Sequence, residues 1–230
     1  MSDLVSQAEE TLLKSKGMAF AEIEETVFDL LSREIDYGEV FVQSTRSESF
    51  GLEDGIVKDG AFSVDAGIGV RALAGEKTGF AYSEDIRLDG LQQAAKAARS
   101  IAKKGASRGA PAYKATAYRA LYDGGDPISS LSDAEKVVLL RQVDGVARAE
   151  DSRVKEVNVR ISASHETMLV MASDGTLAAD IRPLVRLDVS VIVQNGDRRE
   201  RGSAGGGGRR SLFSLGEGGW AGDLAKEAVR

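Results

Sequence analysis

The 230-residue sequence contains no cysteine and a single histidine, His165. The absence of cysteine excludes disulfide bonds and thiolate metal ligands within these residues. It also fits a cytoplasmic protein, because disulfides are rare in that reducing compartment. A catalytic or metal site built from this chain would therefore depend almost entirely on carboxylates.

Long apolar runs and broad basic surfaces are also missing. No apolar stretch approaches the roughly 18 residues that span a bilayer. Residues 1–17 are polar with helical character and lack the basic start, apolar stretch and cleavage site of a secretory signal. The formal net charge is −6, and no basic stripe is broad enough to follow a phosphate backbone. We expect no membrane and no nucleic acid as direct partners.

Helical and strand-like periods alternate in the first half of the chain. Residues 19–35 carry apolar side chains at helical spacing, which predicts an amphipathic helix. Residues 39–82 contain short apolar runs interrupted by Asp54-Gly55, Asp59-Gly60 and Gly75. Because Asp-Gly pairs are typical of hairpin turns, this segment predicts a meander of four or five antiparallel strands. Helical spacing returns over residues 86–105.

The second half repeats this order. Ser132 and Glu135 fit a capping box at the start of a helix. A strand-rich block over 153–204 follows, with alternating apolar residues and a type I′ turn expected at Asn195-Gly196. Another amphipathic helix begins at Trp220 and reaches Arg230 without a cap, so we expect a truncated chain in which this helix continues.

These periods predict an α+β fold of two similar halves, each an antiparallel β-meander with flanking helices. The predicted domains are 1–104 and 131–230, with 105–130 as a connector because it holds two of the three prolines and shows no period. Residues 39–42 can be aligned with 156–159, and Asp54-Gly55 with Asp174-Gly175. We interpret this match as a sign of internal duplication.

The only histidine is followed by a glutamate, as in the zinc-peptidase motif HExxH. That motif needs a second histidine one helical turn later, but Leu169 and Val170 occupy the relevant positions. The surrounding residues are rich in β-formers, so we predict a half-exposed histidine at the entrance of a strand. A catalytic triad would have to pair His165 with Ser162 or Ser164, and nothing marks either serine as activated.

The run "GSAGGGGRR" over 202–210 has the glycine content of a phosphate-binding loop but lacks the GK[ST] ending. Two interpretations remain open: a mobile loop, or a strand kept bare so that another backbone can lie beside it. A strand is expected over 197–201, immediately before the run. As a candidate edge for a substrate strand we select Gly202, Gly205, Gly206, Gly207 and Gly208.

Three blocks of sequence resemble a known family. They are "ESFGLEDGIVKDGAFSVDAGIGVRALAGEKTGFAYSEDI" (48–86), "SDGTLAADIRPLVRLDVSV" (173–191) and "RERGSAGGGGR" (199–209). They are similar to the N-terminal half of the TldD/PmbA family of bacterial zinc metallopeptidases, formerly described as modulators of DNA gyrase. The block "DGTLAADIRPLVRL" is closer to the TldD branch than to the PmbA (TldE) branch, whose members lack the metal site.

The resemblance implies a cytoplasmic peptidase that acts on small or unfolded peptides as a TldD–TldE heterodimer. It also implies zinc bound by an HExxxH motif and a distant cysteine. Neither element occurs here, so no catalytic or metal-ligand residue is assigned, and the catalytic C-terminal domain is expected outside this chain. We therefore predict that these residues alone bind no zinc and hydrolyse no peptide.

Two alternatives accompany this hypothesis. The chain could instead be a non-catalytic peptide- or partner-binding module of the TldE (PmbA) type, and an HExxxH motif in the sequence beyond Arg230 would argue against that. The older idea of a gyrase modulator requires direct binding to gyrase, and the acidic balance of the chain gives it no support.

Overall fold

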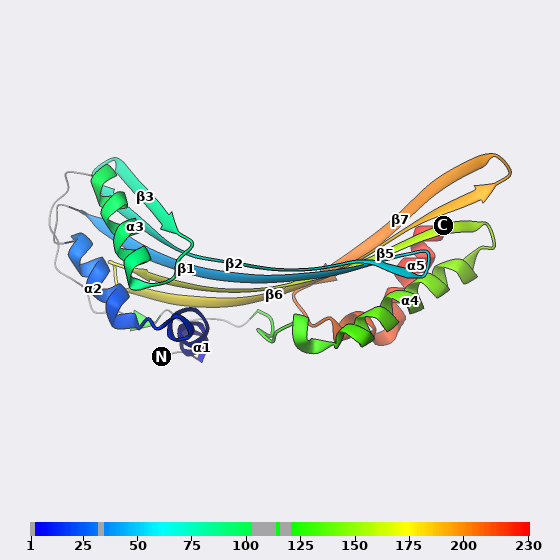
Figure 1. Ribbon diagram of the computed structural model, residues 1–230, viewed down its shortest axis with the longest axis horizontal. Coiled ribbons are helices and arrows are strands. Elements are labelled where there is room, and N and C mark those ends of the chain that lie inside the picture. Colours follow the sequence, from blue (N-terminus) through cyan, green and yellow to red (C-terminus); the bar gives the residue numbers. More distant parts are fainter. Residues whose placement is uncertain (1–2, 32–34, 103–113, 116–120) are drawn as a thin grey trace. The chain divides into compact units, whose positions relative to one another are not determined.

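The computed structural model describes residues 3–31, 35–102, 114–115 and 121–230 (Figure 1). The strands are β1 (Tyr37–Glu53), β2 (Ile56–Ala74), β3 (Lys77–Ser83), β4 (Lys114–Ala115), β5 (Val154–Ala172), β6 (Thr176–Asn195) and β7 (Arg198–Gly208). The α-helices are α1 (Asp3–Ala8), α2 (Phe20–Leu31), α3 (Leu88–Ile101), α4 (Asp133–Glu150) and α5 (Trp220–Val229). A π-helical segment (Glu9–Leu13) follows α1, and the short 3₁₀ helices are Lys14–Lys16, Ile128–Ser130, Phe213–Leu215 and Glu217–Gly219.

The strands of the described ranges form one sheet in the order β3-β2-β1-β5-β6-β4, and β7 pairs with β6. The hydrogen bonds from Ser173 N to Gly38 O and from Asp54 N to Val157 O show that β1 and β5 run antiparallel. The pairs β2–β3 and β6–β7 are also antiparallel, and the two-residue strand β4 pairs parallel with β6. The predicted α+β class, with an antiparallel sheet and flanking helices, is confirmed.

Two compact units divide the chain. Unit 1 comprises Met1–Thr45, Val64–Ala120 and Glu166–Ile181. Unit 2 comprises Arg46–Ser63, Leu121–His165 and Arg182–Arg230. Both units are interleaved along the chain because the long strands β1, β2, β5 and β6 contribute residues to each of them.

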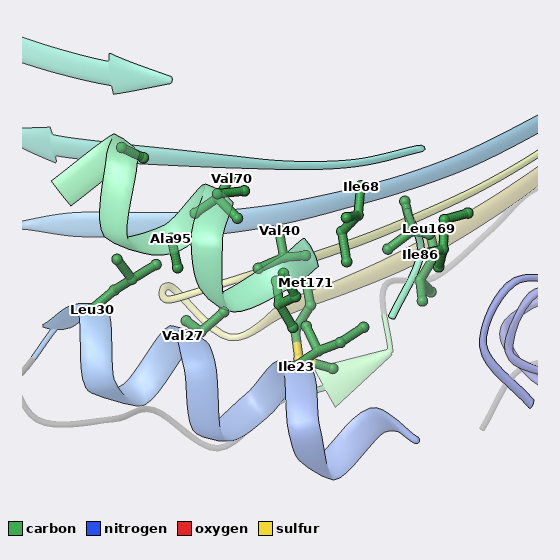
Figure 2. Packing of buried hydrophobic residues seen from close by; sticks show 14 of the residues in the cluster. Ile23, Val27, Leu30, Val40, Ile68, Val70, Ile86, Ala95, Leu169 and Met171 are labelled. Atoms are coloured by element: carbon green, nitrogen blue, oxygen red, sulfur yellow. The ribbon is translucent and has the colours of Figure 1, made fainter. Parts of the chain in front are cut away.

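The core of unit 1 lies between the sheet and the helices α2 and α3. Figure 2 shows Ile23, Val27 and Leu30 on the side of α2 that faces the strands. These three side chains are at most 1% exposed, as the helical spacing of the sequence predicts. Gly79 of β3 lies directly beneath α3, where a Cβ atom would overlap the carbonyl oxygen of Ala98. The absence of a side chain therefore lets helix and strand approach closely.

The core of unit 2 lies between the sheet and the helices α4 and α5. Its apolar side chains alternate along the strands, as predicted, and the buried members of β5 and β6 are Val154, Val157, Val159, Ile161, Ala163, Val185, Leu187, Val189 and Val191. The capping box at the start of α4 is confirmed: Ser132 Oγ accepts a hydrogen bond from Glu135 N, and Glu135 accepts one from Ser132 N. Helix α5 packs on α4 and on β7.

The predicted turns need two corrections. Residues 39–82 lie in three strands and not in four or five, because Asp59-Gly60 lies inside β2 and forms no turn. A Cβ atom at Gly60 would lie 3.6 Å from the ring of Phe50, an ordinary van der Waals contact. At the β6–β7 turn, Asn195 pairs with Arg198, so the two central residues are Gly196 and Asp197. Gly196 has a φ of 60°, and neither Asn195 nor Asp197 has a positive φ. A positive φ only at the first central residue is typical of a type II′ turn, so the predicted type I′ turn is wrong there.

The other turn glycines behave as expected. Asp54 and Gly55 have φ values of 49° and 75°, the type I′ pattern predicted for this pair. In the connector, residues 105–113 and 116–120 lie outside the described residues. The sequential division into 1–104, 105–130 and 131–230 and the internal duplication both stay predictions. Among the described helices, none has both the length and the apolar composition needed to cross a membrane.

Candidate functional site

His165 lies inside β5 and has a structural role in unit 2. Its Nε2 atom is 3.1 Å from the carbonyl oxygen of Gly124, and its Nδ1 atom is 3.0 Å from Nη2 of Arg46. Because a carbonyl oxygen can only accept, Nε2 carries the proton and Nδ1 accepts from Arg46. The side chain is 14% exposed, so the histidine is more buried than predicted and does not stand at a strand entrance.

Arg46 connects the histidine to a carboxylate. Its Nη2 atom also donates to Oδ2 of Asp126 over 2.9 Å. Burial disfavours the charged form of Asp126, but the hydrogen bond and charge of Arg46, together with smaller contributions that include the hydrogen bond from Ile128 N, hold the pKa of the carboxyl below its usual value. The cluster thus attaches the segment around Asp126 to β1 and β5. Since both ring nitrogens of His165 are engaged, it is not placed to activate Ser162 or Ser164.

The zinc that the family resemblance implies does not fit the residues described by the structure. Within these ranges, no three side chains of His, Cys, Asp or Glu lie close enough together to hold a metal ion. The donor set also does not fit, because the sequence supplies one histidine and no cysteine while zinc peptidase sites use several nitrogen or sulfur ligands.

The selected glycines lie in strand β7 and not in a loop. β7 pairs with β6 over its whole length, from Asn195 opposite Arg198 to Val185 opposite Gly208. On its other side no strand pairs with it within the described ranges, which makes β7 an edge strand of the sheet (Figure 1). The run is therefore a strand and not a loop, and the approach of another backbone to its free edge stays a prediction.

The five glycines divide between the two faces of β7. At Gly202 a Cβ atom would overlap the carbonyl oxygen of Ala228, and at Gly206 it would lie 2.8 Å from the ring of Trp220. These two glycines let α5 approach the strand. At Gly205 and Gly207 a Cβ atom would meet residues of β6, whereas nothing lies within 4 Å of that position at Gly208.

A charged hollow, which we call the trough, lies on the face of the unit 2 sheet opposite α4 and α5. It has a volume of about 460 Å³ and is lined by residues from β1, β2, β5, β6 and β7. In a flat sheet the outer strands β2 and β7 would lie about 19 Å apart, four strand spacings of about 4.8 Å. Since both line one small hollow, the sheet of unit 2 is curled around it.

The charged side chains of the trough were not identified from the sequence. They are Glu53, Lys58, Asp59, Arg160, Arg186, Asp188 and Arg201. The alternation of polar and apolar residues along β5 and β6 predicts that Arg160, Arg186 and Asp188 face away from the core. It does not predict that the sheet curls, and curling is what brings β2 and β7 to the same hollow.

A second exposed feature lies on the sheet of unit 1. Phe80 and Tyr82 of β3 are 57% and 73% exposed, and they stand opposite Arg71 and Gly69 of β2. With Phe41 they line a hollow of about 690 Å³. At Gly69 a Cβ atom would lie 3.4 Å from the ring of Phe80, at the short end of ordinary van der Waals contact, so the ring covers this position of β2. We call Phe41, Phe80 and Tyr82 the aromatic face.

Two family models match the chain. Residues 38–102 match the model described as PmbA/TldA metallopeptidase domain 1, and residues 126–230 match the PmbA/TldA metallopeptidase central domain. The chain belongs to the PmbA/TldD metallopeptidase family. The resemblance found in the three sequence blocks is thereby confirmed.

Curated relatives in the PmbA/TldD family point to the TldD branch. The chain is 46% identical to the "Metalloprotease TldD homolog" of Haemophilus influenzae, over 99% of this chain and 48% of that protein. It is 40% identical to the homolog of the same name from Buchnera aphidicola subsp. Schizaphis graminum, over 87% of this chain and 41% of that protein. The chain thus spans about half the length of the curated relatives it matches.

Two solved structures share the fold of this chain. TldE from Thermococcus kodakarensis matches with a TM-score of 0.71 at 15% identity, over 89% of this chain and 46% of that one. A Thermotoga maritima protein described as a modulator of a DNA gyrase matches with a TM-score of 0.70 at 18% identity, over 92% and 47%. At these identities the likeness shows the fold alone.

Proposed function

We propose that this chain is the N-terminal part of a TldD-like zinc metallopeptidase subunit that acts on small or unfolded peptides. In this proposal the chain contributes to assembly with a TldE (PmbA)-like subunit and to enclosure of the substrate, in the cytoplasm. The zinc and the catalytic residues belong to the remainder of the subunit. The observation that carries the proposal is the 46% identity to a TldD homolog over 99% of the chain.

The alternative, a non-catalytic module of the TldE type, receives less support. The TldE structure is 15% identical to this chain, whereas the TldD homologs are 40–46% identical. The aromatic face supports a role in assembly, because soluble monomers rarely leave a cluster of large apolar side chains exposed on a sheet face. We assign this face to contact with the TldE-like subunit.

The assembly proposal is tested by capture. A tagged form of the 230-residue chain and a TldE-like subunit from the same genome are co-expressed and purified through the tag. We expect the TldE-like subunit to be retained, and to be lost when Phe80 and Tyr82 are both replaced by serine. Phe28 of α2 offers a matched control, since it is 54% exposed and does not line the aromatic hollow, so Phe28→Ser should not affect retention. Retention by the Phe80/Tyr82 variant would contradict the assignment.

The catalytic part of the proposal needs the longer protein. A full-length subunit containing these residues, purified with its TldE-like partner, should cleave an unfolded protein such as reduced casein, and a chelator should abolish the cleavage. The 230-residue chain alone should show no cleavage and no stoichiometric zinc. Chelator-sensitive cleavage by the short chain would overturn the assignment of the catalytic residues to the remainder of the subunit.

For the substrate we propose a backbone-mediated contact at the edge of β7. An enzyme that accepts peptides of varied sequence needs contacts that do not depend on side chains, and hydrogen bonds along a strand edge supply them. The position of Gly202–Gly208 on an edge strand supports this proposal. The packing of α5 already explains why Gly202 and Gly206 are glycines. A substitution at Gly208 therefore tests the proposed substrate contact without disturbing that packing.

Gly208 has open space where a side chain would stand. In the full-length enzyme, Gly208→Val should therefore leave folding, zinc content and subunit assembly unchanged while it slows the cleavage of unfolded peptides. If this variant cleaves unfolded peptides at the unmodified rate, the substrate does not pair with the edge of β7, and the glycines of this strand serve only its packing.

A further inference from the structure

The trough contains more cationic than anionic side chains. Lys58, Arg160, Arg186 and Arg201 face Glu53, Asp59 and Asp188, although the chain as a whole has a formal charge of −6. The side chains that line the trough thus have a positive sum of charge, whereas the chain as a whole is negative.

Two of the four cations are already paired. Arg186 donates to both carboxylate oxygens of Asp188, over 2.8 Å from Nε and 2.6 Å from Nη2. Arg186 and Asp188 thus form a bidentate ion pair, in which the carboxylate neutralises most of the guanidinium charge that a ligand could otherwise use. Arg160 donates to Ser49 Oγ over 3.0 Å and lies 3.7 Å from Asp59, a loose contact.

The other two cations have no such partner. Among the described residues, the side chains of Lys58 and Arg201 make no hydrogen bond or ion pair, although the charge of Lys58 contributes to lowering the pKa of the nearby Asp54. They come from the two outer strands of the unit 2 sheet, β2 and β7, and curling of the sheet brings both to the wall of one hollow. A concave wall concentrates the electrostatic potential of its charges more than a flat surface does. The trough is therefore suited to attract an anionic group.

The position of the trough points to the kind of molecule that carries this group. Gly205 of the edge strand β7 lines the trough together with Arg201. A peptide that pairs with the edge of β7 could thus place a terminus or a side chain in the hollow. We propose that the trough binds a carboxylate of an extended peptide, and that Lys58 and Arg201 supply the attraction. This inference rests on the proposed function in that the ligand is a peptide.

The test uses fluorescence anisotropy with the 230-residue chain and labelled, N-acetylated peptides of about ten Ser, Gly and Ala residues at low ionic strength. One peptide has a free C-terminal carboxylate, a second is a C-terminal amide, and a third is an amide with one internal glutamate. We expect at least one acidic peptide to bind roughly two- to fivefold more tightly than the neutral amide, the range for one partly exposed ion pair. A preference for the first indicates the chain terminus, and a preference for the third indicates an acidic side chain.

Variants connect the preference to the trough. Lys58→Gln with Arg201→Gln should remove the advantage of the acidic peptides and leave the affinity for the neutral amide unchanged. Arg198→Gln is the matched control: Arg198 lies on the same strand, is 81% exposed and pairs with Glu200 outside the trough. This control should keep the full preference.

Several results would overturn the inference. Equal binding of acidic and neutral peptides would exclude recognition of a carboxylate while leaving peptide binding intact. An acidic preference that survives in the double variant would place the site elsewhere. If no peptide binds, the trough is not a peptide site, whereas assembly with a TldE-like subunit is measured separately by capture and would still stand.

Discussion

The Nη2 atom of Arg148 lies 2.7 Å from Oδ1 of Asp54, and this contact joins helix α4 to the turn between β1 and β2. The same oxygen accepts a hydrogen bond from Val157 N over 3.1 Å. That backbone hydrogen bond, followed by the interactions with Arg148, holds the pKa of Asp54 below its usual value. One turn residue thus connects a helix, a hairpin and the neighbouring strand of unit 2.

The first prediction concerns acid stability. Because the pKa of Asp54 is lowered in the folded state, its contribution is present above the pKa of the unfolded chain and is lost as the pH falls through the folded value. Asp54→Asn keeps an acceptor for Val157 N but loses the charge. We expect a loss of at most about 1 kcal/mol at pH 7, since both partners are partly exposed.

Urea unfolding between pH 7 and pH 3 measures this effect. The variant should be less stable than the parent at pH 7, and the difference should become smaller as the pH falls below about 4. A difference that is constant over this range would show that the charge of Asp54 does not contribute.

The second prediction concerns His165. His165→Ala removes the groups that bond to Gly124 and Arg46, so the carbonyl of Gly124 loses its side-chain partner while Arg46 keeps only Asp126. We expect a destabilisation of about 1–3 kcal/mol in chemical denaturation. His165→Gln, which retains a donor and an acceptor, should restore part of the loss.

A separate readout distinguishes this structural role from a metal site. In the full-length subunit, His165→Ala should leave the zinc content unchanged. Loss of zinc from the folded variant would show that the histidine is a ligand and that our interpretation of its hydrogen bonds is wrong.

The third prediction compares two glycines of β7. Gly206→Val places a side chain against the ring of Trp220 and should destabilise unit 2 by about 1–3 kcal/mol, the range for overpacking. Gly208→Val, where space is open, should change the stability by less than about 0.5 kcal/mol. Equal effects in thermal unfolding would mean that contact with α5 is not the reason for the bare strand at Gly206.

The fourth prediction concerns Lys136 of α4, which is 2% exposed. Its ammonium forms ion pairs with Glu48 of β1 and with Asp133, and it lies 5.4 Å from the centre of the Phe50 ring. Lys136→Met leaves the part-buried carboxylate of Glu48 without its partner and should cost about 3 kcal/mol. The double variant Lys136→Met with Glu48→Gln should recover a large part of this loss. A double variant no more stable than the single one would show that packing of the lysine stem matters more than the ion pair.

Much of the fold follows from local patterns in the sequence. The capping box at Ser132 and Glu135, the type I′ turn at Asp54-Gly55 and the alternation along β5 and β6 were predictable because each depends on neighbouring residues. The turn expected at Asp59-Gly60 was wrong because Asp59 lies in the continuous strand β2, where its carboxylate occupies the space over Gly51 of β1 and lies 3.7 Å from Arg160 of β5. A local rule cannot include a residue that approaches from another strand.

The family and the α+β class could thus be determined from the sequence alone, since both depend on the order and chemistry of residues along the chain. The tertiary structure decided what the candidate residues do. It placed the glycine run on an edge strand beneath α5, and it engaged both nitrogens of His165 in hydrogen bonds. Through the curling of the unit 2 sheet it also brought Lys58 and Arg201 to one trough. These relationships join residues far apart in the chain, and their distances depend on how strands twist and pack, which no pattern of neighbouring residues records.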